Sequence, residues 1–364
     1  MNHNWKLGEP TESEELLTFD DNKAYLLGMS ERYLAVKVMR ESSRRITRRQ
    51  KMLPPTFHSV MIIVNLENKE RQEILIDKGS EHSLDRVYFL SSAVIGELKS
   101  SWGLSLGSMR AWDIGSQEEI FSKEYPTQFA LSPLYDANSQ EVVLNSMVNG
   151  NPGIVRLNTD DDNSVKETFF DSSNIGGVVA FSSPYLLCHH PSLENTFNVC
   201  KIVENKVEIV STLEIPDLYF NKLAISNSYI VKVTSRPFPS QTISIWRLTS
   251  GEVVKKINLP PPFPLESPSL SGILLSYTHL IVRMTYTSNS RRNQMVLLYD
   301  IEELVTQKKF KPRHFITDDF HRFGDSLEAG CMMISQNKTK LLVCDEYGCN
   351  IKFHSWNFWK SAKK

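Results

Sequence analysis

Clustered arginines give this sequence its clearest candidate binding chemistry. The polar segment 40–51 contains a run of them, Arg44, Arg45, Arg48 and Arg49. Guanidinium groups bind phosphates and carboxylates through paired hydrogen bonds, so this segment favours a phosphorylated or acidic peptide as its partner. A flexible, solvated insertion would account for the same charge and length, and both interpretations stay open.

Further residues could join such a site. Ser290-Arg291-Arg292-Asn293 is a second basic segment. Exposed aromatic side chains beside arginines are typical of protein-binding hot spots. The candidates are Trp102 in a Gly- and Ser-rich segment, His189 and His190 before Pro191, and Phe238 between two prolines. Each of them could instead pack against its own loop.

The sequence contains no recognisable catalytic or metal-binding motif. A phosphate-cradling glycine loop, a nucleophile elbow and a metalloprotease helix are all absent. His189 and His190 are adjacent, so in an extended chain they point to opposite sides, and no third ligand lies nearby in the sequence. Asp160-Asp161-Asp162 lacks the ligand spacing of an EF-hand. We therefore expect a protein that is not an enzyme and holds no metal or cofactor.

The elements that must position these residues follow a repeat. A strand ends in a hydrophobic or aromatic residue, a variable residue and an aliphatic residue, and this ending recurs at intervals of roughly 45 residues. The endings are Val64-Asn65-Leu66, Trp112-Asp113-Ile114, Val155-Arg156-Leu157, Cys200-Lys201-Ile202, Trp246-Arg247-Leu248, Tyr299-Asp300-Ile301 and Trp356-Asn357-Phe358. An all-β repeat of this length predicts a seven-bladed β-propeller, with stacked sandwiches of strand pairs as the alternative.

Each repeat also carries an inner pair of apolar strands joined by a short polar turn. The predicted pairs are 26–30 with 33–36, 87–91 with 93–95, 129–132 with 142–144, 178–182 with 185–187, 223–226 with 229–231, 273–276 with 280–282, and 332–335 with 341–343. Such apolar runs suit strands that are buried on both faces. The connections from second to third strand and from blade to blade then share one face. The candidate residues should lie there, and the basic loops of blades one and six could approach each other.

The last repeat lacks an outer strand, because its third strand, around 351–356, lies almost at the end of the sequence. Glu15-Leu16-Leu17-Thr18-Phe19 is strand-like and precedes the first repeat. We predict that it becomes the outer strand of the seventh blade and closes the ring. The expected organisation is an N-terminal segment with the closing strand at 1–22 and a single propeller domain at 23–364.

The composition argues against several classes of protein. Of the 364 residues, 41% are hydrophobic and 23% charged, and the net charge of −1 gives no overall field that attracts nucleic acid or anionic lipid. No signal-peptide core and no membrane-spanning apolar run is present. Five cysteines, an odd number, argue against a disulfide framework. We expect a cytoplasmic or nuclear protein with protein partners and no membrane insertion.

Three of the strand endings carry a family resemblance. Trp112-Asp113, Trp246-Arg247 and Tyr299-Asp300, each followed by an aliphatic residue, resemble the strand ends of WD-repeat propellers. The pattern covers almost the whole chain, but the Gly-His dipeptide that opens a WD repeat is absent. The hydrogen-bonded network of the family is therefore not expected, and packing should hold the blades together.

A second resemblance lies ahead of the first blade. Asn4-Trp5-Lys6-Leu7-Gly8 is similar to the segment that links the F-box to the propeller in F-box/WD-repeat proteins, with a chance match as the alternative. This resemblance implies the substrate-recognition part of an F-box-type (SCF) ubiquitin ligase receptor, with a cullin-RING ligase adaptor as partner. The alternatives are a scaffold subunit of a trafficking, chromatin or RNA-processing complex, and an enzyme with polar groups in the central channel.

Overall fold

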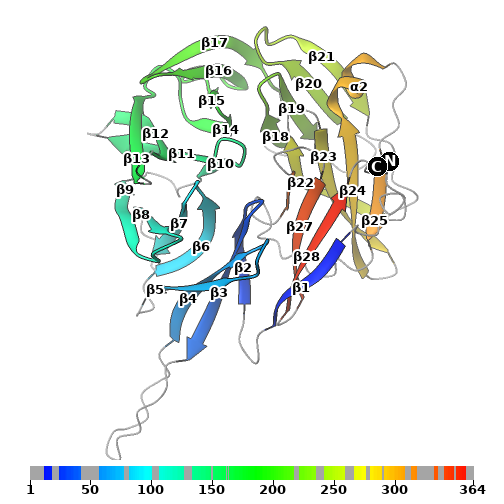
Figure 1. Cartoon of the computed structure of the whole chain (residues 1–364). Coiled ribbons are helices and arrows are strands. Elements are labelled where there is room, and N and C mark those ends of the chain that lie inside the picture. Colours follow the sequence, from blue (N-terminus) through cyan, green and yellow to red (C-terminus); the bar gives the residue numbers. More distant parts are fainter. Residues whose placement is uncertain are drawn as a thin grey trace, which may run out of the picture.

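The computed structural model describes residues 12–18, 24–41, 57–77, 82–100, 106–126, 133–148, 151–160, 162, 164–216, 221–234, 242–258, 266–275, 279–288, 291–307, 313–317, 332–334, 340–347 and 350–357. Within these residues the strands pair into seven four-stranded antiparallel sheets. Figure 1 shows the sheets standing side by side around a common centre.

Six sheets follow the chain order. The first three contain β2 (Ala24–Met29), β3 (Tyr33–Glu41), β4 (Phe57–Asn65) and β5 (Arg71–Asp77); β6 (His82–Phe89), β7 (Ala93–Ser100), β8 (Leu106–Asp113) and β9 (Glu119–Pro126); and β10 (Leu134–Asp136), β11 (Glu141–Val148), β12 (Asn151–Thr159) and β13 (Val165–Asp171). The next three contain β14 (Val178–Ser182), β15 (Tyr185–His189), β16 (Thr196–Val203) and β17 (Lys206–Glu214); β18 (Asn221–Ile225), β19 (Tyr229–Thr234), β20 (Thr242–Arg247) and β21 (Val253–Asn258); and β22 (Glu266–Leu275), β23 (His279–Ser288), β24 (Arg291–Asp300) and β25 (Arg313–Thr317).

The last sheet joins the two ends of the chain. It takes β26 (Met332–Ile334), β27 (Lys340–Tyr347) and β28 (Asn350–Asn357) from the C-terminal part and β1 (Glu12–Thr18) from the N-terminal part. β1 runs antiparallel to β28, from Glu12 opposite Ser355 to Thr18 opposite Asn350. The strand-like segment thus takes the fourth place of the last sheet, beginning at Glu12 rather than at Glu15.

The inner strand pairs lie where the apolar runs predicted them in six sheets. The third sheet differs, because its first strand is the short β10 at Leu134–Asp136, whereas the predicted strand at 129–132 lies outside the described residues. β10 still pairs with β11, with Leu134 opposite Val143.

Apolar side chains fill the spaces between neighbouring sheets. Each of the larger clusters combines residues of two sheets, as where Met61 and Ile63 of β4 pack with Leu84 and Trp112 of the second sheet. Because most sheets are covered on both faces, their central strands are apolar at nearly every position. Each fully buried aliphatic or aromatic side chain contributes about 1.5–3 kcal/mol, so these interfaces are the main source of stability.

The recurring strand ending has a structural cause. In four sheets its aliphatic residue donates a backbone hydrogen bond to the turn between the first two strands of the same sheet. The bonds run from Leu66 N to Arg32 O (2.8 Å), Ile114 N to Ser92 O (3.0 Å), Ile202 N to Pro184 O (2.8 Å) and Leu248 N to Ser228 O (2.9 Å). The aliphatic side chains are buried. Each of these four endings therefore joins two turns at what we call the lower end of its sheet.

A left-handed residue closes the turn that follows three of these endings. Lys69, Gln117 and Gly251 have φ angles of 63°, 64° and 69°. Their N–H groups donate to the carbonyls of Asn65, Asp113 and Arg247, each over 2.9 Å. Glycine adopts this conformation without strain, whereas a residue with a Cβ is strained by about 1–2 kcal/mol.

Hydrogen bonds between sheets add to the packing expected from the sequence. Lys37 Nζ of β3 donates to Leu84 O of β6 over 3.0 Å. Asn145 of β11 bonds both backbone groups of Val178 on β14, donating to its carbonyl (3.0 Å) and accepting from its N–H (2.8 Å). Leu84 and Val178 each lie at a register shift of the inner strand. Such bulges leave backbone groups without a ladder partner, and side chains of the preceding sheet satisfy them here.

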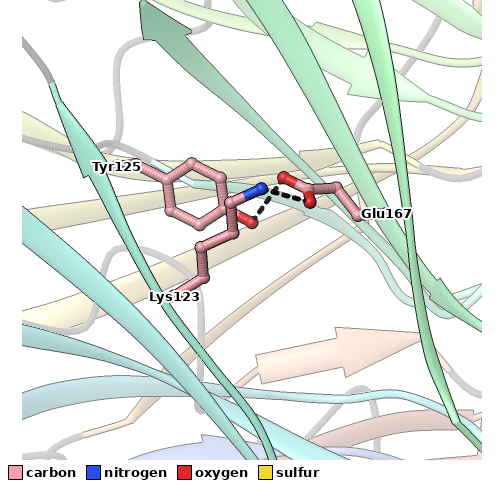
Figure 2. Close-up of polar contacts among 3 residues, drawn as sticks. All are labelled: Lys123, Tyr125 and Glu167. Carbon is pink, nitrogen blue, oxygen red and sulfur yellow. Dashed lines mark hydrogen bonds and ion pairs between the residues drawn. The ribbon is translucent and has the colours of Figure 1, made fainter. Parts of the chain in front are cut away.

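A polar cluster joins the outer strands of the second and third sheets (Figure 2). Tyr125 on β9 is 2% exposed, and its hydroxyl donates to Glu167 Oε1 on β13 over 3.0 Å. Lys123 Nζ lies 2.5 Å from Glu167 Oε2. Burial raises the pKa of Tyr125, so its hydroxyl stays protonated and can donate at neutral pH.

One short helix, α2 (Ile301–Thr306), follows the sixth strand ending in place of a turn. Asp300 caps it by accepting from Glu303 N over 3.0 Å, and Ile301 and Leu304 are buried. The prediction of strands alone missed this helix. The Asp300-x-x-Glu303 spacing just before apolar residues is a helix-start signal that could have indicated it.

Candidate functional site

The connections from second to third strands and from sheet to sheet lie at one end of the sheets, which we call the upper face. Two of these connections are described, at 172–177 and 190–195, together with the first two residues, 215–216, of a third. Six predicted contact residues lie outside the described residues, namely Arg44, Arg45, Arg48, Arg49, Trp102 and Phe238. What the sequence predicts for them stays a prediction.

Arg291 and Arg292 are not in a loop, which corrects the sequence interpretation. They open β24 and lie opposite Ser288 and Thr287 of β23. Only residues 289 and 290 separate the two strands. The β-branched and aromatic residues at the end of β23, such as Tyr286 and Thr287, favour continued pairing and extend the hairpin to this point. Arg40 likewise belongs to the end of β3 rather than to the basic loop.

His190 begins the connection between β15 and β16, as predicted, whereas His189 belongs to the strand before it. His189 ends β15, and its ring lies 5.0 Å from that of Phe197 on β16. Its backbone N–H donates to Gly177 O over 2.8 Å. Partial burial lowers the pKa of His189, because the charged ring would lose hydration. The result is a neutral aromatic surface that still keeps ring nitrogens for hydrogen bonding.

His190 shapes its loop. Its Nδ1 accepts from the N–H groups of Ser192 and Leu193, both over 3.2 Å, and its own N–H donates to Thr196 O over 2.9 Å. An accepting Nδ1 places the ring proton on Nε2. The loop is thereby held in one shape that exposes Leu193 by 56%. Sequence reasoning did not select Leu193, although an apolar residue between serine and glutamate in a polar loop is a usable signal.

Backbone hydrogen bonds join the described parts of these connections to one another. Gly177 O accepts from His189, which joins 172–177 to the β15 end, and Asn195 O accepts from Ile215 N over 2.7 Å, which joins 190–195 to 215–216. Gly176 has a φ of 75°, and a Cβ there would overlap the carbonyl of His189. These contacts require a glycine and hold the connections at a fixed spacing.

The charge of this surface is negative. Asp171 and Glu194 are exposed on it. The N–H of Ser173 donates to Asp171 over 2.9 Å and holds the pKa of that carboxyl below its usual range, so Asp171 is ionised at neutral pH. This part of the upper face therefore suits partners with basic or hydrogen-bonding groups, whereas the predicted basic loops belong to other sheets.

The described residues contain no cluster suited to a metal ion, and their two cysteines are buried. No group of three or more His, Cys, Asp or Glu side chains among them could hold a metal ion. Cys188 and Cys200 are buried free thiols, and the pKa of Cys188 is raised by its hydrogen bond with Cys200 and by burial, which keeps it unreactive. No described helix has the length and apolar character needed to span a bilayer.

Comparison with known proteins places the chain by its fold. No family model matches the sequence, and no curated protein matches it. A chain of the mitotic checkpoint complex superposes with a TM-score of 0.51 at 10% identity, over 96% of this chain and 92% of that one. A prolyl endopeptidase superposes with a TM-score of 0.52 at 10% identity, over 98% of this chain. The chain spans about half of that enzyme, 52% of its length.

A third solved structure, the Dos1 propeller, aligns over 97% of this chain and 96% of that one, with a TM-score of 0.48 and 10% identity. The four-stranded antiparallel sheets arranged around a common centre give the chain the fold of a β-propeller. Within a propeller, loops at the end of rigid sheets are free to vary without loss of the core, because the sheets bury their faces against one another. The surface around His189 and Leu193 occupies such a position.

Proposed function

We propose that this propeller is a non-catalytic protein-interaction module whose upper face binds partners. The observation that carries the proposal is the 190–195 connection, in which hydrogen bonds to the His190 ring fix the exposed apolar residue Leu193 beside that ring. Preorganised side chains bind with little loss of conformational entropy, which is the general basis of a hot spot. The similarity to a chain of a multiprotein complex is consistent with this role.

The proposed finer role is the substrate-recognition part of an F-box-type (SCF) ubiquitin ligase receptor, in the cytoplasm or the nucleus. Its supports are the resemblance of Asn4-Trp5-Lys6-Leu7-Gly8 to an F-box linker and that of the strand endings to WD repeats. In this role Arg44, Arg45, Arg48 and Arg49 bind an acidic or phosphorylated segment of the substrate. A scaffold propeller in another complex is the alternative.

We further propose that the seven sheets are seven blades of a closed ring. The pairing of β1 with β28 supports this, because it uses the N-terminal strand to complete the C-terminal sheet. Deletion of residues 1–20 should then lower the melting temperature by several degrees, through loss of the fourth strand of that sheet. An unchanged melting temperature would exclude closure by β1.

Affinity purification of the tagged chain from its native cells, followed by mass spectrometry, tests the ligase role. Recovery of a cullin and its adaptor supports that role, whereas a stable complex without them supports the scaffold. Replacing Arg44, Arg45, Arg48 and Arg49 by glutamate should abolish recovery of the substrate but leave the adaptor bound. Lys166→Glu, on exposed β13, is the matched control and should change neither. Unchanged substrate capture by the glutamate variant would dismiss the arginine site.

A further inference from the structure

The tip of the loop between β15 and β16 is held by one side chain. Residues 191–195 are all exposed, so apolar burial does little to fix their shape. At the base of the loop, His190 N–H donates to Thr196 O over 2.9 Å. At its tip, the N–H groups of Ser192 and Leu193 donate to His190 Nδ1, each over 3.2 Å. Within the part of the chain that the structure describes, these two N–H groups have no other acceptor.

The His190 ring acts as an asparagine side chain does in an Asx turn. Its Nδ1 is bonded to Cγ, as Oδ1 is in asparagine, and asparagine oxygens commonly accept from N–H groups a few residues further along the chain. An imidazole ring differs from an amide because it can gain a proton near neutral pH. A protonated Nδ1 is a donor and cannot accept from Ser192 and Leu193. Protonation therefore removes both bonds at the tip of the loop.

Most of the described charged and titratable groups on the elements around this loop are acidic. They are Glu194 in the loop itself, His189 on β15, Asp171 at the end of β13, Glu214 at the end of β17 and Lys232 on β19. Lys232 is buried, and its Nζ donates to Pro216 O. Burial lowers the pKa of His189, so its ring gains a proton at a lower pH than an ordinary histidine. The three carboxylates are exposed and can stabilise a charged His190 ring after it has left the turn.

Leu193 is the residue whose position depends on these bonds. Its side chain is 56% exposed, and its own N–H is one of the two donors. While both bonds are present, the side chain has a fixed position, and a partner binds it with little loss of conformational entropy. Without them the tip must become ordered on binding, which weakens the interaction. The sheet itself is unaffected, because β15 and β16 are joined by backbone groups that do not titrate.

We propose that His190 is a pH-sensitive cap. With Nδ1 unprotonated, the ring holds the tip of the loop and presents Leu193 to partners. With Nδ1 protonated, the tip is released and partners bind more weakly. Two hydrogen bonds are lost, so we expect binding to differ about tenfold between the two forms of the ring. The effect on binding rests on the proposed function of the upper face, whereas release of the tip does not depend on it.

Nuclear magnetic resonance of the isotope-labelled protein tests release of the tip directly. The ring nitrogens of His190 and the amides of Ser192 and Leu193 are followed from about pH 8 to about pH 5. We expect Nδ1 to be unprotonated at the upper limit, and both amide signals to shift with the same midpoint as the ring. His189→Gln is the matched control. It removes the neighbouring titrating ring but leaves the acceptor in place, so both amides should still titrate.

Two variants at position 190 separate the hydrogen bonds from the charge. His190→Asn supplies an acceptor that does not titrate, so the amides of Ser192 and Leu193 should keep one position over the whole pH range. His190→Ala supplies no acceptor, so at about pH 8 both amides should lie where the unaltered protein has them at about pH 5. The proposal is overturned if the amides of the unaltered protein do not follow the ring, or if they titrate equally in His190→Asn.

The effect on binding is tested with the partners that the tagged chain recovers from its native cells at about pH 7.5 and that Leu193→Ser does not recover. After washing at about pH 5.5, the unaltered protein should retain about tenfold less of these partners than His190→Asn, because only the histidine releases the tip. Equal retention by the two proteins overturns the proposal. Unchanged recovery by Leu193→Ser would instead refute the proposed function of this surface, and amides that still follow the ring would distinguish that failure from a failure of the cap.

Discussion

The contact between Tyr125 and Glu167 should be a measurable link between the second and third sheets. Tyr125→Phe removes a hydroxyl that donates to a carboxylate over 3.0 Å. Hydrogen bonds to charged groups contribute about 1.5–3 kcal/mol. Glu167 keeps Lys123 and is 25% exposed, so water can replace the lost donor and the cost should lie near the lower limit, about 1.5 kcal/mol.

Substitution of the acceptor, Glu167, should lower the free energy of unfolding further than substitution of the donor, Tyr125. Glu167→Leu leaves the hydroxyl of the buried Tyr125 without its acceptor, at about 2 kcal/mol, since an unpaired buried polar group costs 1–3 kcal/mol. Lys123→Met should cost under about 0.5 kcal/mol, because Lys123 is 47% exposed and exposed ion pairs contribute little. In the double variant, Tyr125→Phe with Glu167→Leu, no unpaired hydroxyl remains. Its loss should therefore be about 1 kcal/mol smaller than the sum of the single losses.

Urea unfolding of the unaltered protein and the four variants measures these free energies from the transition midpoints. The link would be refuted if the double variant lost as much free energy of unfolding as the two single variants together. It would also be refuted if Lys123→Met lost as much as Tyr125→Phe. Spectroscopy gives a second check. Because burial and Glu167 raise the pKa of Tyr125, Tyr125→Phe should leave the tyrosinate absorbance at pH 11 unchanged. A smaller absorbance at that pH would show that the ring ionises normally.

Three other predictions concern single residues. Asn145→Leu should lower the free energy of unfolding in urea by about 2 kcal/mol, because both backbone groups of Val178 lose their partner. Asn145→Asp keeps one of the two bonds and should lower it less. Equal losses for the two variants would contradict this account. Gln117→Gly should raise the free energy of unfolding by about 0.5–1 kcal/mol, because glycine adopts the positive φ of this position without strain. Gly251→Ala should lower it by about 1 kcal/mol for the converse reason. A destabilised Gln117→Gly variant would be inconsistent with strain at that turn. The lowered pKa of His189 means that the unfolded chain binds its proton first as the pH falls. Stability should therefore decline from about pH 6.5 downward. His189→Gln should flatten that part of a melting-temperature profile, and an unaltered profile would exclude the histidine as its source.

The strands could be predicted well from the sequence because the repeated strand ending reflects contacts within a single sheet. An aliphatic residue such as Leu66 or Ile114 must both enter the core and bond a turn of its own sheet, so its type and spacing recur. The helix α2 was missed because the same position was interpreted only as a strand ending, although Asp300 and Glu303 carried a helix-start signal.

Contacts between sheets could not be predicted in the same way. Asn145 satisfies the backbone of Val178, which any residue type could present, so no side-chain pattern identifies the partner. The candidate surface has the same limitation. His189 and His190 stood out by type, but their partners Gly177 and Thr196 are backbone groups whose positions depend on how loops fold. The arginines at 291 and 292 were misplaced because charge was taken to indicate a loop where the ladder continues.

The residues at the lower ends of the sheets and those at the upper face therefore differ in what they determine. The lower ends are fixed by the repeated strand endings, and substitutions there affect stability first. At the upper face, the bonds of His190, Asn195 and Ile215 do not recur among the sheets for which such bonds are described. They hold one particular surface in place. Under the proposed function, residues that depart from the repeat are those that bind partners, and variants at Leu193 or His190 should alter binding with little change in stability.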